Sequence, residues 1–78
     1  MARLPRSLKQ SDVIRALLNA GGVEIKGAGK GGHRSVVMPN GRKTTIQTGS
    51  LPEGTLRAII RQIGMSTDEF EEARNKRG

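Results

Sequence analysis

The chain has no cysteine and one histidine, His33, and these two shortages exclude common kinds of site. Without cysteine there are no disulfide bonds and no thiolate ligands, and one histidine cannot build a typical zinc centre. We therefore expect no cofactor and no metal site, so any catalysis should be metal-free or use a hard cation held by carboxylates. A free imidazole both takes and gives a proton near neutral pH, which makes His33 the one good candidate for proton transfer.

Aromatic residues and long apolar runs are also scarce. Phe70 is the only aromatic residue, which argues against RRM or OB-fold proteins that stack single-stranded bases on aromatic platforms. No apolar run approaches the ~18 residues of a membrane span, and the N-terminus lacks the apolar segment of a signal peptide. The sequence predicts a soluble, cytoplasmic protein with no membrane partner.

Acidic residues are few and unevenly placed. There are 14 Lys and Arg against 7 Asp and Glu, for a net charge of +7, so a polyanion and above all a nucleic acid is the expected partner. Four of the acids lie in residues 68–72, whereas residues 26–43 carry five cations and no acid. A merely solvated cationic rim is the alternative interpretation of that segment.

The first third of the chain predicts a helix followed by a short strand. Ser7 with Gln10 matches a capping box, Ser11 with Asp12 offers a second start, and Gly21 is a stop signal. Residues 23–26 then alternate apolar and polar, with Val23 and Ile25 expected on the buried face. Between these signals an apolar stripe lies at helical spacing: Val13, Ile14, Leu17 and Leu18.

Two further strands are expected over residues 33–38 and 43–48. Asn40 and Gly41 lie between them, and because both residues tolerate positive φ they predict a tight hairpin and antiparallel pairing.

The last third predicts two helices. Residues 55–63 place apolar side chains at i, i+3, i+4 and i+7, and Gly64 follows as a stop signal. Residues 66–69 match a capping box that opens a short final helix, with Phe70 expected to anchor it to the core.

Together these elements predict an α+β fold of order α-β-β-β-α. It has a three-stranded antiparallel sheet, helices on one face and a short extra C-terminal helix. This is the arrangement of double-stranded-RNA-binding domains. The length of 78 residues allows one domain, residues 1–78, with a core of about residues 11–70.

A glycine-rich loop precedes the only histidine. Gly31 and Gly32 carry no side chain, so their N–H groups can approach a phosphate closely, and Lys30 and Arg34 place a cation on either side of His33. Two alternatives stay open: the glycines serve only positive φ, and the histidine only forms a hydrogen bond at a strand entrance.

The chain resembles HicA-type mRNA interferases, the toxins of toxin-antitoxin pairs. The resemblance covers about residues 11–70 and implies a double-stranded-RNA-binding-like fold, endoribonuclease activity on mRNA, and neutralisation by an acidic HicB-type antitoxin. His33 falls at the position of the family's catalytic histidine. The matching motifs, in order, are residues 30–34, 39–42, 54–57 and 60–62, followed by Gly64.

The sequence departs from the family pattern at two positions that matter below. Gly22 stands where relatives have an aromatic or large apolar residue, and Met38 where many have a second histidine.

The remaining RNA-binding candidates are cations outside the glycine loop. Arg57 and Arg61 lie four residues apart on one helix face, where an ordinary solvated face is the alternative. A non-catalytic RNA-binding module that recognises backbone shape and charge is the alternative function. The candidates in this group are Arg42, Lys43, Arg57 and Arg61.

Overall fold

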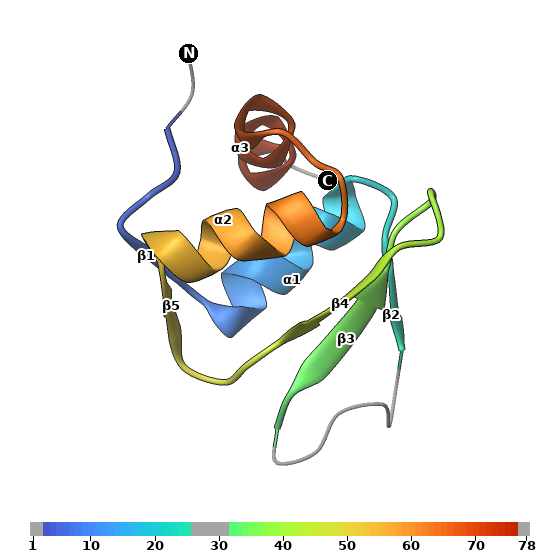
Figure 1. Ribbon diagram of the computed structural model, residues 1–78, viewed down its shortest axis with the longest axis horizontal. Coiled ribbons are helices and arrows are strands. Elements are labelled where there is room, and N and C mark those ends of the chain that lie inside the picture. The colour runs from blue at the N-terminus through green and yellow to red at the C-terminus, as the bar shows by residue number, and fades with distance from the viewer. Residues whose placement is uncertain (1–2, 26–31, 77–78) are drawn as a thin grey trace.

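The computed structural model describes residues 3–25 and 32–76, which form three helices and two small sheets (Figure 1). In chain order the elements are β1 (Ser7–Lys9), α1 (Gln10–Asn19), β2 (Val23–Ile25), β3 (Arg34–Val37), β4 (Lys43–Ile46), β5 (Ser50–Pro52), α2 (Glu53–Gln62) and α3 (Thr67–Asn75).

The larger sheet has the order β2-β3-β4, and both of its pairings are antiparallel. The helices are gathered on one side of this sheet, where α1 and α2 pack against it and α3 packs on α1 (Figure 1). This confirms the predicted α+β, double-stranded-RNA-binding-like class, including the extra C-terminal helix.

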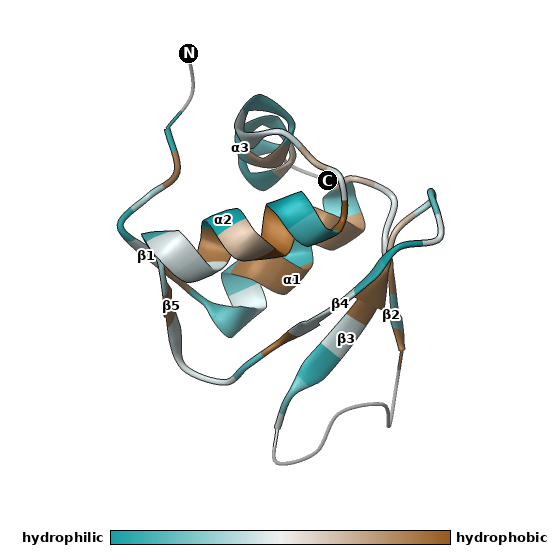
Figure 2. Cartoon of the chain, viewed as in Figure 1, coloured by the Kyte–Doolittle hydropathy of each residue, from teal (hydrophilic) through white to brown (hydrophobic). Residues whose placement is uncertain are grey.

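The core lies between the helices and the inner face of the sheet. The apolar stripe of α1 is buried except for Leu18, which is 40% exposed, and Phe70 is fully buried as predicted. Figure 2 shows the apolar stretches of α1 and α2 in brown. The core residues from these three helices are Val13, Ile14, Ala16, Leu17, Leu56, Ile59, Ile60, Phe70 and Ala73.

The pairing of β2 with β3 shows that the buried face expected for residues 23–26 is wrong. Glu24 pairs with Val36, which is fully buried, and paired residues share a face. Glu24 therefore lies on the inner face, whereas Val23 lies on the outer face and is 66% exposed. The alternation was recognised but assigned to the wrong face, because the register with β3 decides which residues point inward.

A second sheet of two strands was not predicted. β1 pairs antiparallel with β5, Leu8 opposite Leu51, and joins the chain before α1 to the chain before α2. Ser7 belongs to β1, and α1 begins at Gln10 with Lys9 as its N-cap, so the expected Ser7 capping box is wrong. A serine committed to a strand pairing with Pro52 cannot also cap the helix.

The hairpin between β3 and β4 forms as expected, but its turn does not have positive φ at both Asn40 and Gly41. The N–H of Met38 donates to the carbonyl of Arg42 at 2.8 Å, and Gly41 has φ +86°. Among residues 3–25 and 32–76, positive φ occurs only at glycines, so Asn40 does not adopt it. The Asn40 side chain instead accepts from the Arg42 N–H and donates to the Ile63 carbonyl, which ties the hairpin to the end of α2.

Gly22 lies where α1 approaches the sheet. A Cβ at this position would meet the Met38 sulfur and Val36 Cγ1 at 2.8 Å each, and the Leu17 carbonyl oxygen at 2.9 Å. Buried Met38 therefore fills the space that a side chain at position 22 would need.

α3 begins at the predicted capping box. The Ser66 hydroxyl accepts from the Glu69 N–H at 3.1 Å, and the Glu69 carboxylate accepts from the Ser66 N–H at 2.9 Å. Among the described residues, no helix is long and apolar enough to cross a membrane.

Candidate functional site

His33 is exposed and directly precedes β3, in a position set by Gly32. Gly32 has φ +88°, a conformation that L side chains rarely adopt, and a Cβ there would come within 2.9 Å of Thr48 Cγ2. Both the backbone conformation and the lack of space therefore favour glycine at position 32. Lys30 and Gly31, the other loop residues assigned to phosphate binding, lie outside the described residues.

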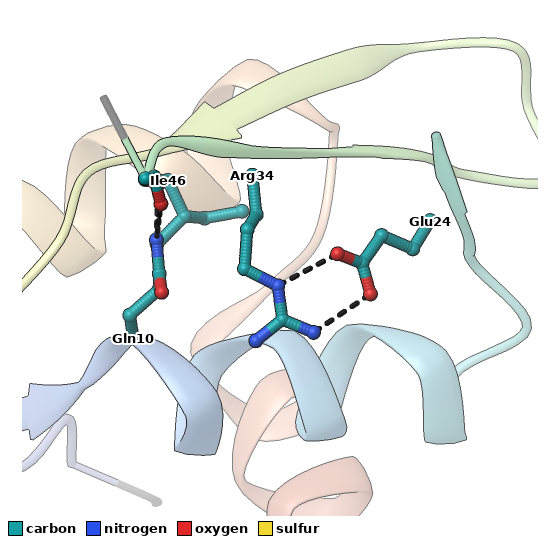
Figure 3. Close-up of polar contacts among 5 residues, drawn as sticks. Gln10, Glu24, Arg34 and Ile46 are labelled. Atoms are coloured by element: carbon teal, nitrogen blue, oxygen red, sulfur yellow. Dashed lines mark hydrogen bonds and ion pairs between the residues drawn. The ribbon is translucent and has the colours of Figure 1, made fainter. Parts of the chain in front are cut away.

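Gln10, the first residue of α1, also holds Gly32 in place. Its Nε2 donates to the Gly32 carbonyl at 2.8 Å. The same nitrogen donates to the Ile46 carbonyl at 3.0 Å (Figure 3). Its own N–H donates to the Gly49 carbonyl at 3.1 Å. Sequence reasoning placed Gln10 in a capping box and missed this role, because its partners are 22 and 36 residues away in the chain.

Arg34 is engaged by Glu24 across the inner face of the sheet. Its guanidinium donates two bonds to the carboxylate, at 2.6 and 2.7 Å (Figure 3). The hydrogen bond with Glu24 raises the pKa of Arg34, partial burial opposes this, and the charge of Glu24 adds to it, so Arg34 stays charged. The side chains remain 38% and 27% exposed. The positive field expected over residues 26–43 is therefore partly neutralised here, by an acid just outside that segment.

Arg42 and Lys43 lie at the opposite end of β3 from His33. Lys43 pairs with Val37, and Arg42 reaches the end of α2, where its guanidinium lies beside Gly64. The four residues of β3 separate the two ends by roughly 13 Å, at about 3.3 Å per residue. The structure does not bring these two cations together with the histidine.

Arg57 and Arg61 are exposed on α2, as their spacing predicts. Arg57 pairs with Glu53 at 3.0 Å. The fold adds two cations that the sequence analysis did not select, since Arg3 and Arg6 line a hollow of about 530 Å³ together with Arg57. The pairing of β1 with β5, the bond from the Glu53 N–H to the Arg6 carbonyl at 2.8 Å and the burial of Leu4 bring the N-terminal segment to this place. No local pattern in the sequence indicates these long-range contacts.

A metal ion in a protein is usually held by several acidic or histidine side chains close together. Within residues 3–25 and 32–76, no three such side chains come together in a way that would hold a metal ion.

The fold and the exposed histidine at the head of β3 define a small double-stranded-RNA-binding-domain-like protein with a candidate acid-base group. A family model described as the HicA toxin of bacterial toxin-antitoxin matches residues 11–65. The chain belongs to this HicA toxin family. No curated protein sequence matches the chain significantly.

Proposed function

We propose that this toxin is a metal-independent mRNA endoribonuclease in which His33 is a general acid or base. The observation that carries the proposal is an exposed imidazole on a peptide that two other segments hold in place. A group of this kind is accessible to RNA and extends from a restrained peptide. Access and restraint both favour proton transfer in a transition state.

The proposed reaction is transesterification within the RNA strand. The ribose 2′-oxygen forms a bond to phosphorus while the bond from phosphorus to the 5′-oxygen breaks, which leaves a 2′,3′-cyclic phosphate and a free 5′-hydroxyl. One proton leaves the 2′-hydroxyl and one reaches the 5′-oxygen, and His33 carries out one of these transfers. N–H groups of the glycine loop and nearby cations, Lys30 among them, stabilise the negative charge on phosphorus.

RNA is proposed to contact cations at several places along the chain. The hairpin end of β3 offers Lys43 and Arg42, and α2 offers Arg57 and Arg61. Contacts of this type bind backbone phosphates and supply affinity without reading sequence. Arg34 joins this set to the extent that it shares its charge between Glu24 and a phosphate.

The partner in the toxin-antitoxin pair is proposed to be an acidic HicB-type antitoxin that covers His33 and the cations of residues 26–43. Opposite charge on the two proteins would speed their association. Co-expression with the small acidic protein encoded by the neighbouring gene tests this. That protein should bind the chain and suppress its toxicity, and failure to do either would contradict the proposal.

His33→Ala tests the chemistry. The variant removes the imidazole but keeps every cation, so cleavage should fall by about 10² to 10⁴ while RNA binding stays near that of the parent. Lys43→Ala is the matched control, because it removes an exposed charge and should weaken binding with little effect on cleavage of bound RNA.

The parent is assayed in excess EDTA, with the 2′,3′-cyclic phosphate identified in the product. Strict dependence on magnesium would overturn the metal-independent mechanism. A folded parent that binds RNA and never cleaves it would instead support the non-catalytic RNA-binding module.

A further inference from the structure

The Gln10 amide is the contact between α1 and the residue that precedes His33. An amide nitrogen carries two hydrogens, and here one is directed to the Gly32 carbonyl at 2.8 Å and the other to the Ile46 carbonyl at 3.0 Å. The donor capacity of this side chain is used in full. Because Ile46 lies in β4 and is fully buried, the contact joins the glycine to the rigid part of the sheet.

The Gly32 carbonyl has special value as an acceptor. This carbonyl and the N–H of His33 belong to one planar peptide group, so a bond that fixes the oxygen also fixes the plane from which the His33 Cα extends. On its other side, Gly32 lies against Thr48, with no space for a Cβ between them. The peptide is therefore restrained by α1 and by the chain that follows β4.

The residue after His33 is restrained as well. Arg34 is the first residue of β3, and its guanidinium makes two bonds to Glu24 in β2. His33 thus lies between two residues that are each tied to a neighbouring element, and the Gln10 contact acts on its own peptide group.

We propose that Gln10 is the positioning residue for His33, an inference that rests on the proposed catalytic role of that histidine. Gln10 does not touch the reacting atoms. It holds the Gly32–His33 peptide in the orientation that directs the imidazole at the scissile phosphate. Loss of the amide donors would let this peptide rotate, and displacement of a catalytic group by about 1 Å can lower a rate by about 10²-fold.

The test compares Gln10→Ala and Gln10→Met with a matched control at the other end of the same helix. Met keeps the size of the side chain but has no donors, so it reports on the bonds if the Ala variant folds poorly. The control is Asn19→Ala, because Asn19 Nδ2 also donates to two main-chain carbonyls, those of Ala73 at 3.0 Å and Lys76 at 3.2 Å. All three substitutions remove one amide with two carbonyl partners.

We expect both Gln10 variants to lower kcat for cleavage by about 10²-fold while KM changes by no more than about twofold, since RNA contacts are kept. Asn19→Ala should leave kcat near that of the parent, even if its melting temperature falls as much as that of the Gln10 variants. If Asn19→Ala lowers kcat as much as the Gln10 variants do, or if these keep full kcat, the positioning role is wrong.

A second measurement separates this inference from the proposed activity. The ¹⁵N-labelled parent and variants are compared by NMR at the His33 amide. This amide shares a peptide group with the Gly32 carbonyl, so its chemical shift reports the hydrogen bond that this carbonyl accepts from Gln10. Gln10→Met should move this signal and Asn19→Ala should not. A parent that cleaves no RNA, together with a moved His33 signal, would refute the proposed function but keep the structural role of Gln10. An unmoved signal would overturn the role of Gln10 itself.

Discussion

The two ends of α1 are held by the same chemical device in different surroundings. Gln10 at the start and Asn19 at the end each use one amide nitrogen to bind two main-chain carbonyls from distant segments. The Gln10 end meets the exposed glycine and histidine at the head of β3. The Asn19 end meets the last turn of α3, whose Phe70 is fully buried. The first end orients a candidate catalytic group, whereas the second attaches a helix to the core.

Charge divides the molecule differently. α3 carries four of the seven acids of the chain, and the cations assigned to RNA lie on the β3–β4 hairpin, on α2 and around His33. Like charges repel, so RNA should approach these cations and avoid the acids of α3. Because Arg42 and Lys43 lie at the opposite end of β3 from His33, the cations are not confined to one end of α1.

The largest effect is expected from Phe70→Ala at the α3 end. Loss of a fully buried aromatic side chain costs about 3–5 kcal/mol, a large part of the stability of a small domain. Urea denaturation followed by circular dichroism measures this loss, with Leu18→Ala as the control, because Leu18 is 40% exposed and should change stability far less. Cleavage per folded molecule should be unchanged. A folded Phe70→Ala variant with much lower kcat would remove the distinction between the two ends.

A smaller effect is expected from Glu24→Gln at the His33 end. A partly exposed ion pair contributes about 0.2–1 kcal/mol, so stability should fall only slightly. The substitution removes the carboxylate charge that pairs with the Arg34 guanidinium, so RNA should bind more tightly. In a His33→Ala background, which keeps the RNA intact, the salt dependence of binding should steepen by up to about 0.7 for one added phosphate contact.

Glu53→Gln is the comparison for that experiment, since it releases Arg57 from a similar pair on α2. An affinity that rises equally in both variants would show a general effect of net charge. No rise in Glu24→Gln would mean that Arg34 does not contact RNA.

The smallest effect concerns the pH dependence of stability at the α3 capping box. Hydrogen bonds from the Ser66 N–H and, secondarily, from its side chain lower the pKa of Glu69. Because the folded state has the lower pKa, this contribution is complete above the ordinary glutamate range and is lost as pH falls through the lowered pKa. The difference in melting temperature between parent and Glu69→Gln should thus shrink with acidification.

Ser66→Ala tests the cause, because it removes one partner of the box and should cost about 1 kcal/mol near neutral pH. In the Ser66→Ala background, the difference in melting temperature between the proteins with Glu69 and with Gln at this position should depend less on pH. The same pH dependence in both backgrounds would show that the Ser66 hydroxyl plays no part in it.

Much of the fold could be predicted because its signals are local. Helical spacing of apolar residues located α1 and α2, the box at Ser66 located the start of α3, and Asn40-Gly41 located the hairpin. Each of these patterns depends on residues a few positions apart. The assignment of Phe70 to the core also followed from the sequence, since a single large aromatic side chain gains most by burial.

The features that were missed depend on residues far apart in the chain. β1 and β5 have three residues each, too few to show a period, and their pairing joins Leu8 to Leu51. The inward position of Glu24 depends on the register with β3. At the site, the location of His33 could be predicted from the glycines before it. The contacts of Gln10 and the Glu24 partner of Arg34 required the fold.

The crowding around Gly22 has a consequence for how relatives of this chain can carry a side chain at this position. A Cβ there would meet the Leu17 carbonyl oxygen at 2.9 Å, besides the side chains of Met38 and Val36. A backbone oxygen cannot become smaller, so smaller side chains at residues 36 and 38 would not make enough room by themselves. In a relative with a large residue here, the end of α1 should therefore lie farther from the sheet than it does in this chain.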